Sequence, residues 1–95
     1  KHGRLLFYTT NKKVAEQYGD IIIENNVKYN TPLIVDIENE LSYHSNRFKN
    51  VLCEFKNSNI YDVLICKNVK DPYISKDNGR IYYLYSDYYI KKPKM

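Results

Sequence analysis

A run of apolar, aromatic and β-branched residues covers Leu5–Thr9 and is typical of a buried strand. The polar residues Thr10 and Asn11 follow it at once. Either side chain can accept a hydrogen bond from an unpaired N–H of a first helical turn, so both are suitable caps. The pattern therefore predicts a strand that leads directly into a helix.

The residues after this cap follow a helical period. Val14, Ala15 and Tyr18 fall on one face of the expected helix, and the residues between them point to water. Gly19 ends the helix, because glycine tolerates the left-handed conformation found at helix C-termini. A strand that carries Tyr8 and a helix that carries Tyr18 are expected to bring these two rings close together.

After the first helix, the β-branched run Asp20–Glu24 predicts a short edge or connecting strand. The middle of the chain then holds a further strand and the clearest helical pattern. Apolar positions alternate with others through Pro32–Asn39, which predicts a half-buried strand. Ser45 or Asn46 can cap a helix over Arg47–Asn57. The apolar stripe of that helix consists of Phe48, Val51, Leu52 and Phe55. Carboxylates on the solvent side of the strand and beyond its end are Asp36, Glu38 and Glu40.

Two further strands are predicted near the C-terminus. Tyr61–Cys66 has a nearly continuous apolar centre, which is expected in the middle of a sheet. Asn68–Gly79 is rich in turn-forming residues and predicts a long loop. Arg80–Tyr85 follows as the last strand. This order of elements predicts an α+β fold, with a small, mostly antiparallel sheet and two short helices.

Chain length limits the number of domains, and net charge limits the kinds of ligand that are expected. Ninety-five residues supply one hydrophobic core, so residues 1–95 are expected to form a single domain. Because the first residue is Lys1 and not Met, a fragment of a longer chain is the alternative. The net charge of +4 permits contact with the phosphates of NAD or of nucleic acid. The eleven tyrosines suit strands with one wet face or a surface on which rings stack.

The two cysteines, Cys53 and Cys66, lie among apolar neighbours and are predicted to be small buried side chains in a reducing compartment. The sequence holds no C-x-x-C pair and no clustered histidines, so no metal site is expected. It also holds no apolar run near 18 residues, so no membrane span is expected. These features favour a cytoplasmic location.

The Leu5–Gly19 block resembles the second conserved block of ADP-ribosyltransferases of the diphtheria-toxin and poly(ADP-ribose) polymerase type. In that family a strand ending in a Tyr–Ser/Thr run leads into a helix of the form K-x-A-x-x-Y. The two tyrosines of the family enclose the nicotinamide ring of NAD. The resemblance therefore implies NAD as ligand, with Tyr8 and Tyr18 beside nicotinamide and Thr9 and Thr10 lining the pocket.

The later segments also resemble this family, above all its small versions in polyvalent proteins of phages and mobile elements. The matching stretches are Leu33–Leu41, Tyr61–Asp71 and Arg80–Lys91. If active, such a domain transfers ADP-ribose to a macromolecule.

The chain departs from the family at its first and third motifs. The four residues before Leu5 are too few for the family's upstream strand with His or Arg, and His2 lies too near to replace it. The catalytic Glu of the family falls on Ile81. Asp77 is expected in the loop and Asp87 beyond the last strand. The resemblance thus implies a truncated or degenerate domain whose catalytic activity is open.

Two functional hypotheses follow from the sequence. The first is an ADP-ribosyltransferase-like domain that binds NAD. The alternative is a non-enzymatic module that contacts protein or nucleic acid through a basic surface rich in tyrosine.

Overall fold

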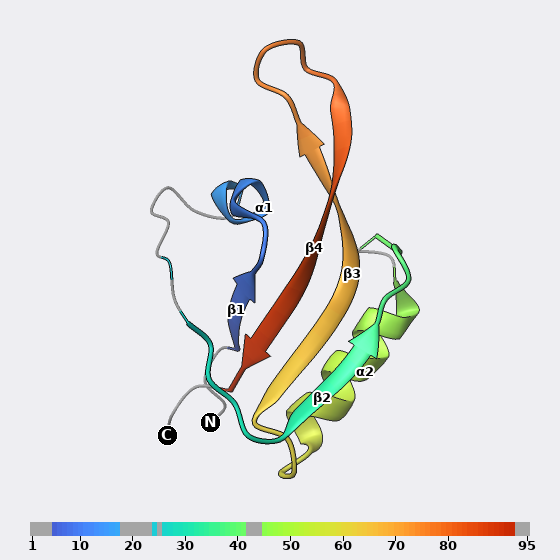
Figure 1. The fold of residues 1–95 in the computed structure, drawn as a ribbon. Coiled ribbons are helices and arrows are strands. Elements are labelled where there is room, and N and C mark those ends of the chain that lie inside the picture. The colour runs from blue at the N-terminus through green and yellow to red at the C-terminus, as the bar shows by residue number, and fades with distance from the viewer. Residues whose placement is uncertain (1–4, 18–23, 25, 42–44, 93–95) are drawn as a thin grey trace.

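The computed structural model describes residues 5–17, 24, 26–41 and 45–92. Its elements, in chain order, are β1 (Leu6–Thr9), α1 (Lys12–Glu16), β2 (Pro32–Asp36), α2 (Asn46–Asn57), β3 (Val63–Ile74) and β4 (Ile81–Lys91). The strands form one sheet in the order β1-β4-β3-β2 (Figure 1). The predicted α+β class with two helices is confirmed for this part of the chain.

The prediction of a mostly antiparallel sheet is wrong, because the sheet is mixed. β4 is antiparallel to both β1 and β3, but β2 and β3 run parallel. The physical reason is the connection through α2. A helix that crosses over one face returns the chain to the same end of the sheet, so the next strand starts in the same direction.

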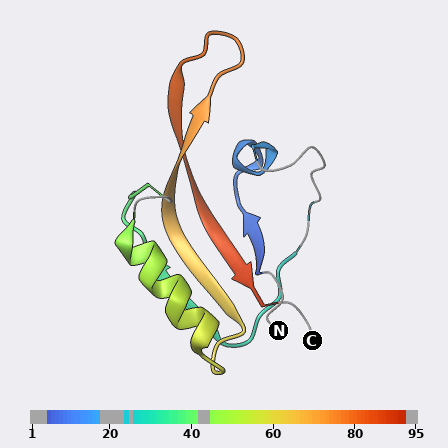
Figure 2. The ribbon, with the colours of Figure 1, turned by 180° about the vertical axis from the view of Figure 1, so that it is seen from behind.

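Helix α2 covers one face of the sheet and forms the core with it (Figure 2). Its cap is Ser45, whose hydroxyl oxygen accepts the N–H of Phe48 over 3.0 Å. Asn11 caps α1 in the same way and accepts the N–H of Lys13 over 2.9 Å. The buried cluster consists of Val14, Ile37, Phe48, Val51, Phe55, Leu64, Cys66, Val69, Tyr88 and Ile90.

The strand register sorts side chains onto two faces. Leu64 and Ile90 are paired neighbours and both belong to the core beneath α2. Residues one position away point to the opposite side, because side chains alternate along a strand. The row that crosses all four strands on that side is Tyr8, Tyr89, Ile65 and Ile34. We call the side opposite α2 the second face.

Strands β3 and β4 extend beyond β1 and β2 as a two-stranded arm, which comprises Val69–Ile74, Ile81–Ser86 and the turn between them (Figure 1). The loop predicted over Asn68–Gly79 is therefore wrong for most of its length. The register shifts between Cys66 and Val69, which is a β-bulge. After this bulge the two strands stay paired out to Ile74 and Ile81.

Candidate ligand-binding face

The end of β1 is bonded to the middle of β4 through two residues. The N–H of Asp87 donates to the hydroxyl oxygen of Thr10 over 3.0 Å. In return, the N–H of Thr10 donates to the carbonyl of Asp87 over 3.1 Å. These bonds hold Thr10 against Asp87, just after the last residue of β1 and at the start of the turn into α1.

The bulge residue Asn68 continues this contact across the sheet. Its N–H donates to the Oδ1 atom of Asp87 over 3.1 Å, and its side-chain amide donates to both carboxylate oxygens of Asp36 at 3.1 Å. Asn68 has a φ of 58°, a left-handed conformation that Asn adopts more readily than most residues. Thr10, Asp87, Asn68 and Asp36 thus form a hydrogen-bonded polar row near the carboxyl ends of β1 and β2.

Asp36 is held as a carboxylate in this row. The side-chain hydrogen bond from Asn68 lowers its pKa most, and the N–H of Glu38, which donates over 2.7 Å, lowers it further. The positive charges of Arg47 and Lys67 act in the same direction. The polar row therefore presents a stable negative charge at neutral pH.

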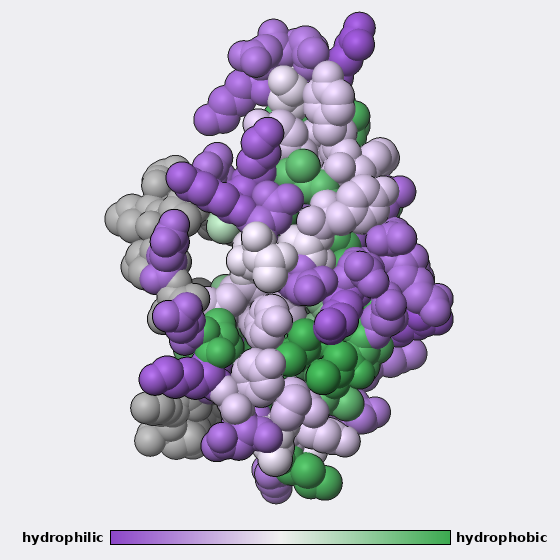
Figure 3. Space-filling model, viewed as in Figure 1, coloured by the Kyte–Doolittle hydropathy of each residue, from purple (hydrophilic) through white to green (hydrophobic). Residues whose placement is uncertain are grey.

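Tyrosine rings flank the polar row on both sides along β4. Tyr89 is paired with Tyr8 on one side, and Tyr85 and Tyr83 follow on the arm at 52% and 47% exposure. The ammonium of Lys70 lies over the ring of Tyr83, 4.3 Å from its centre. Figure 3 views this face and shows pale side chains of intermediate hydropathy running from the arm down its middle. The second face therefore combines aromatic, anionic and cationic groups.

The residues predicted to bind NAD fall in different places. Tyr8 is half-buried on the second face, and Thr10 lies in the polar row. Thr9 is paired with Tyr88 and so points to the α2 side, where its hydroxyl oxygen accepts the N–H of Asn11 over 3.3 Å. Tyr18 lies outside the described residues. The structure thus brings Tyr8 and Thr10 to one face and separates Thr9 from them.

The sequence analysis missed Asp87. It was expected beyond the last strand, but β4 runs to Lys91 and includes it. The two-residue alternation of Ile81, Tyr83 and Tyr85 continues without a break to Asp87. This alternation could have indicated that the strand includes Asp87. Ile81, which occupies the Glu position of the resemblance, lies at the far end of the arm. It is about 26 Å along the strand from the Tyr89 that pairs with Tyr8.

The two cysteines differ from each other. Cys66 is buried as predicted, and burial raises the pKa of its thiol to about 12. Cys53 is exposed, so its predicted burial is wrong. The buried side chains of α2 are those of Phe48, Val51 and Phe55. Cys53 lies outside this stripe, on the solvent side of the helix.

Two kinds of special site are absent from the described residues. They contain no group of three or more His, Cys, Asp or Glu side chains placed to hold a metal ion. Nor does that part of the chain include a helix with the length and apolar character needed to cross a membrane.

Comparison with known proteins gave no relatives. No protein-family model matches the chain, and no curated protein or solved structure matches it.

Proposed function

We propose that the second face binds NAD and that the chain is an ADP-ribosyltransferase-like domain. Support comes from the groups gathered on this face: the ring of Tyr8, the hydroxyl of Thr10 and the carboxylates of Asp36 and Asp87. Nicotinamide and adenine are flat rings that stack on tyrosine. Ribose hydroxyls donate hydrogen bonds to carboxylates, and Lys70 supplies positive charge for a pyrophosphate.

The observation that carries this proposal is the carboxylate of Asp87 within β4, beside the end of β1. In ADP-ribosyl transfer the bond between ribose C1′ and nicotinamide nitrogen breaks, nicotinamide leaves, and a nucleophile of the acceptor attacks C1′. Positive charge develops on the ribose as the bond breaks, so a nearby carboxylate stabilises the transition state. In this proposal Asp87 takes this role, which the apolar side chain of Ile81 is chemically unable to perform.

A titration of NAD followed by calorimetry and by NMR shifts tests the proposal. Binding is expected for the wild-type chain, with shifts that map to Tyr8, Thr10 and Asp87. Asp87→Asn should weaken binding at least about tenfold, a loss of about 1.4 kcal/mol. Asp77→Asn removes the same charge in the turn of the arm and should bind as the wild type does. No binding at about 1 mM NAD, the weak end of specific affinity, would remove the proposal.

A second candidate is contact with single-stranded nucleic acid through the arm. The observation that favours it is the pair of exposed rings at Tyr83 and Tyr85 with Lys70 stacked over the first. Bases stack on such rings without much preference for sequence, and cations beside them contact phosphates. Lys76 and Arg80 add positive charge at the outer turn of the arm.

Anisotropy of a labelled oligothymidylate tests this second candidate. Affinity should fall as salt rises, because phosphate contacts release counterions. The double variant Tyr83→Ala/Tyr85→Ala should lose most of the binding. Tyr82→Ala is the matched control, since Tyr82 is equally exposed at 46% but lies on the other face of the arm. Equal losses in both variants would argue against stacking on the second face.

A further inference from the structure

Strand β2 (Pro32–Asp36) has an open edge. It pairs with β3 on one side, and within the described residues no strand pairs with its other side. Ile34, at its centre, is 55% exposed. Edge strands are usually protected by a Lys, a bulge or a covering segment, because open backbone groups template the addition of another strand. β2 carries neither a Lys nor a bulge, and its potentially protective residues, Pro32 and Asp36, lie at its two ends, so the centre of the edge around Ile34 is left open.

The hydrogen bonds to β3 reveal which backbone groups face this open edge. Just before β2, the carbonyl of Thr31 accepts the N–H of Asp62 over 3.1 Å. Just after it, the N–H of Ile37 donates to the carbonyl of Lys67 over 2.8 Å. Both groups point to β3, and successive residues of a strand point to opposite sides. The backbone groups of Pro32, Ile34 and Asp36 therefore point outward.

Arg47 closes one end of this edge. Its Nη1 atom donates to the outward carbonyl of Asp36 over 3.2 Å and lies 2.7 Å from a carboxylate oxygen of Glu38. The outward groups left for another strand are the carbonyl of Pro32, the N–H and carbonyl of Ile34, and the N–H of Asp36. This is the pattern that an added strand of a few residues needs.

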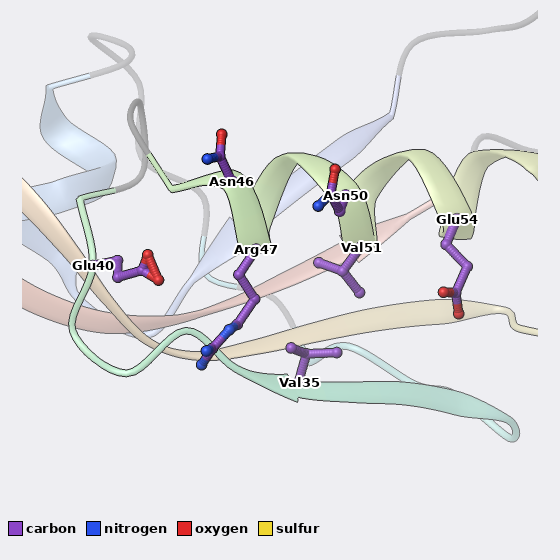
Figure 4. Close-up of a pocket in the computed structure, with 7 residues that line it drawn as sticks. All are labelled: Val35, Glu40, Asn46, Arg47, Asn50, Val51 and Glu54. Atoms are coloured by element: carbon purple, nitrogen blue, oxygen red, sulfur yellow. The ribbon is translucent and has the colours of Figure 1, made fainter.

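A groove between β2 and α2 runs beside the edge (Figure 4). Val35 of the strand and Val51 of the helix point toward each other in it. The other lining residues are Glu40, Asn46, Arg47, Asn50 and Glu54. Since Arg47 is paired with Glu38, and since Glu40 and Glu54 form no ion pair among the described residues, the groove carries excess negative charge. This contrasts with the net charge of +4 of the whole chain.

We propose that the open edge of β2 binds an extended, basic segment of a partner protein by strand addition. Main-chain hydrogen bonds to Ile34 supply affinity, and alternate side chains of the added segment enter the groove. One apolar side chain lies over Val35 and Val51, and a Lys or Arg faces Glu54 or Glu40. This inference uses none of the residues proposed to bind NAD except Asp36, whose main-chain N–H it engages.

The first test uses a probe peptide, a blocked octapeptide that alternates Val and Lys, with a Val–Glu octapeptide for comparison. The Val–Lys peptide should bind and should shift the amide resonances of Ile34 and Asp36. The Val–Glu peptide should bind at least tenfold more weakly. Equal binding of the two, or no binding of either, would overturn the proposal. So would a dimer of the protein alone in sedimentation that Ile34→Pro abolishes, since a second copy would then occupy the edge.

Substitutions at Ile34 distinguish the contribution of its backbone N–H to peptide binding from that of its side chain. Ile34→Pro removes the outward N–H and leaves the bonds to β3 in place, as proline is tolerated on edge strands. Ile34→Ala keeps that N–H and loses the exposed side chain. Peptide binding should be lost in the first variant and reduced by less than fivefold in the second. Thermal melting must show both variants folded, and normal binding by a folded Ile34→Pro protein would contradict strand addition.

Charge reversal tests the groove. Glu54→Lys should weaken the Val–Lys peptide at least fivefold and strengthen the Val–Glu peptide. Glu16→Lys makes the same change of charge on the exposed side of α1, and it should leave both affinities unchanged. Equal effects of the two substitutions would show that only the net charge matters, and the groove would lose its assigned role.

Discussion

The hydroxyl of Tyr88 donates a 2.7 Å hydrogen bond to the carboxylate of Asp71, and both side chains are buried. Tyr88 belongs to the part of β4 beside β1, whereas Asp71 lies on the arm portion of β3. The ring of Phe48 in α2 packs edge-on against Tyr88, at 6.0 Å and 82°. The helix, the sheet and the base of the arm are therefore joined at one buried side chain.

Tyr88→Phe keeps the ring and removes this hydrogen bond. Removing one partner of a buried hydrogen bond costs about 1–3 kcal/mol, so the free energy of unfolding should fall by that amount. Urea unfolding followed by circular dichroism measures the change. Tyr82→Phe, at an exposed position on the same face, should change stability by less than about 0.5 kcal/mol. A similar small change in Tyr88→Phe would show that the buried bond contributes little.

The bulge at Asn68 gives a second prediction, because its φ of 58° is unfavourable for most side chains. Asn68→Ala and Asn68→Gly both remove the amide contacts with Asp36. Glycine adopts this φ without strain, whereas alanine there costs about 1–2 kcal/mol. The Ala variant should therefore be less stable than the Gly variant by about 1 kcal/mol in urea unfolding. The reverse order would mean that the bulge relaxes when Asn68 is replaced.

The sequence predicted α2 well, because a stripe of four apolar residues and a serine cap act locally. It failed at the arm, where Asp71 and Pro72 indicated a turn. Beyond the bulge, the N–H of Lys70 points away from β4 to the carbonyl of Glu40. Pro72 has the same orientation two residues later, so its missing N–H costs no bond to β4. A proline is tolerated at this position because β2 has already ended and no described strand needs the missing N–H. Where a neighbouring strand ends is a property of the tertiary structure.

The candidate site was predictable only where its residues are close together in the sequence. Tyr8 and Thr10 come from one continuous segment, so local pattern was enough to select them. Asp36, Asn68 and Asp87 meet only because the register of three strands places them in one row. No sequence pattern indicates that Asn68 lies in a β-bulge. Without this bulge the polar row does not form.

The cysteines should differ in reactivity. The pKa of Cys66 is raised to about 12 by burial, so at pH 8 this side chain is a protonated, inaccessible thiol. Cys53 is exposed on α2. Iodoacetamide should therefore alkylate Cys53 in the native protein and Cys66 only after unfolding. Mass spectrometry of the digested protein identifies the modified site, and native labelling of Cys66 at the rate of Cys53 would contradict its burial.

The hydrogen bonds of Asp62 make the stability of the fold depend on pH in the acid range. Its carboxylate accepts the N–H of Asn30 over 2.7 Å and that of Thr31 over 2.9 Å, and the bond from Asn30 is the main cause of its lowered pKa. Because the folded pKa lies below the ordinary value of 3.8, ionised Asp62 stabilises the fold above that pH. The stabilisation is lost as the pH falls from 3.8 through the folded pKa.

Asp62→Asn should therefore be less stable than the wild type at pH 6, and the difference should shrink as the pH drops below 3.8. Urea unfolding at a series of pH values measures this difference. Thr31→Val removes only the longer hydroxyl contact, at 3.3 Å, and should lower stability less and with a weaker pH dependence. If the difference between Asp62→Asn and the wild type stays constant down to pH 2, the carboxylate of Asp62 does not hold the start of β2 against β3.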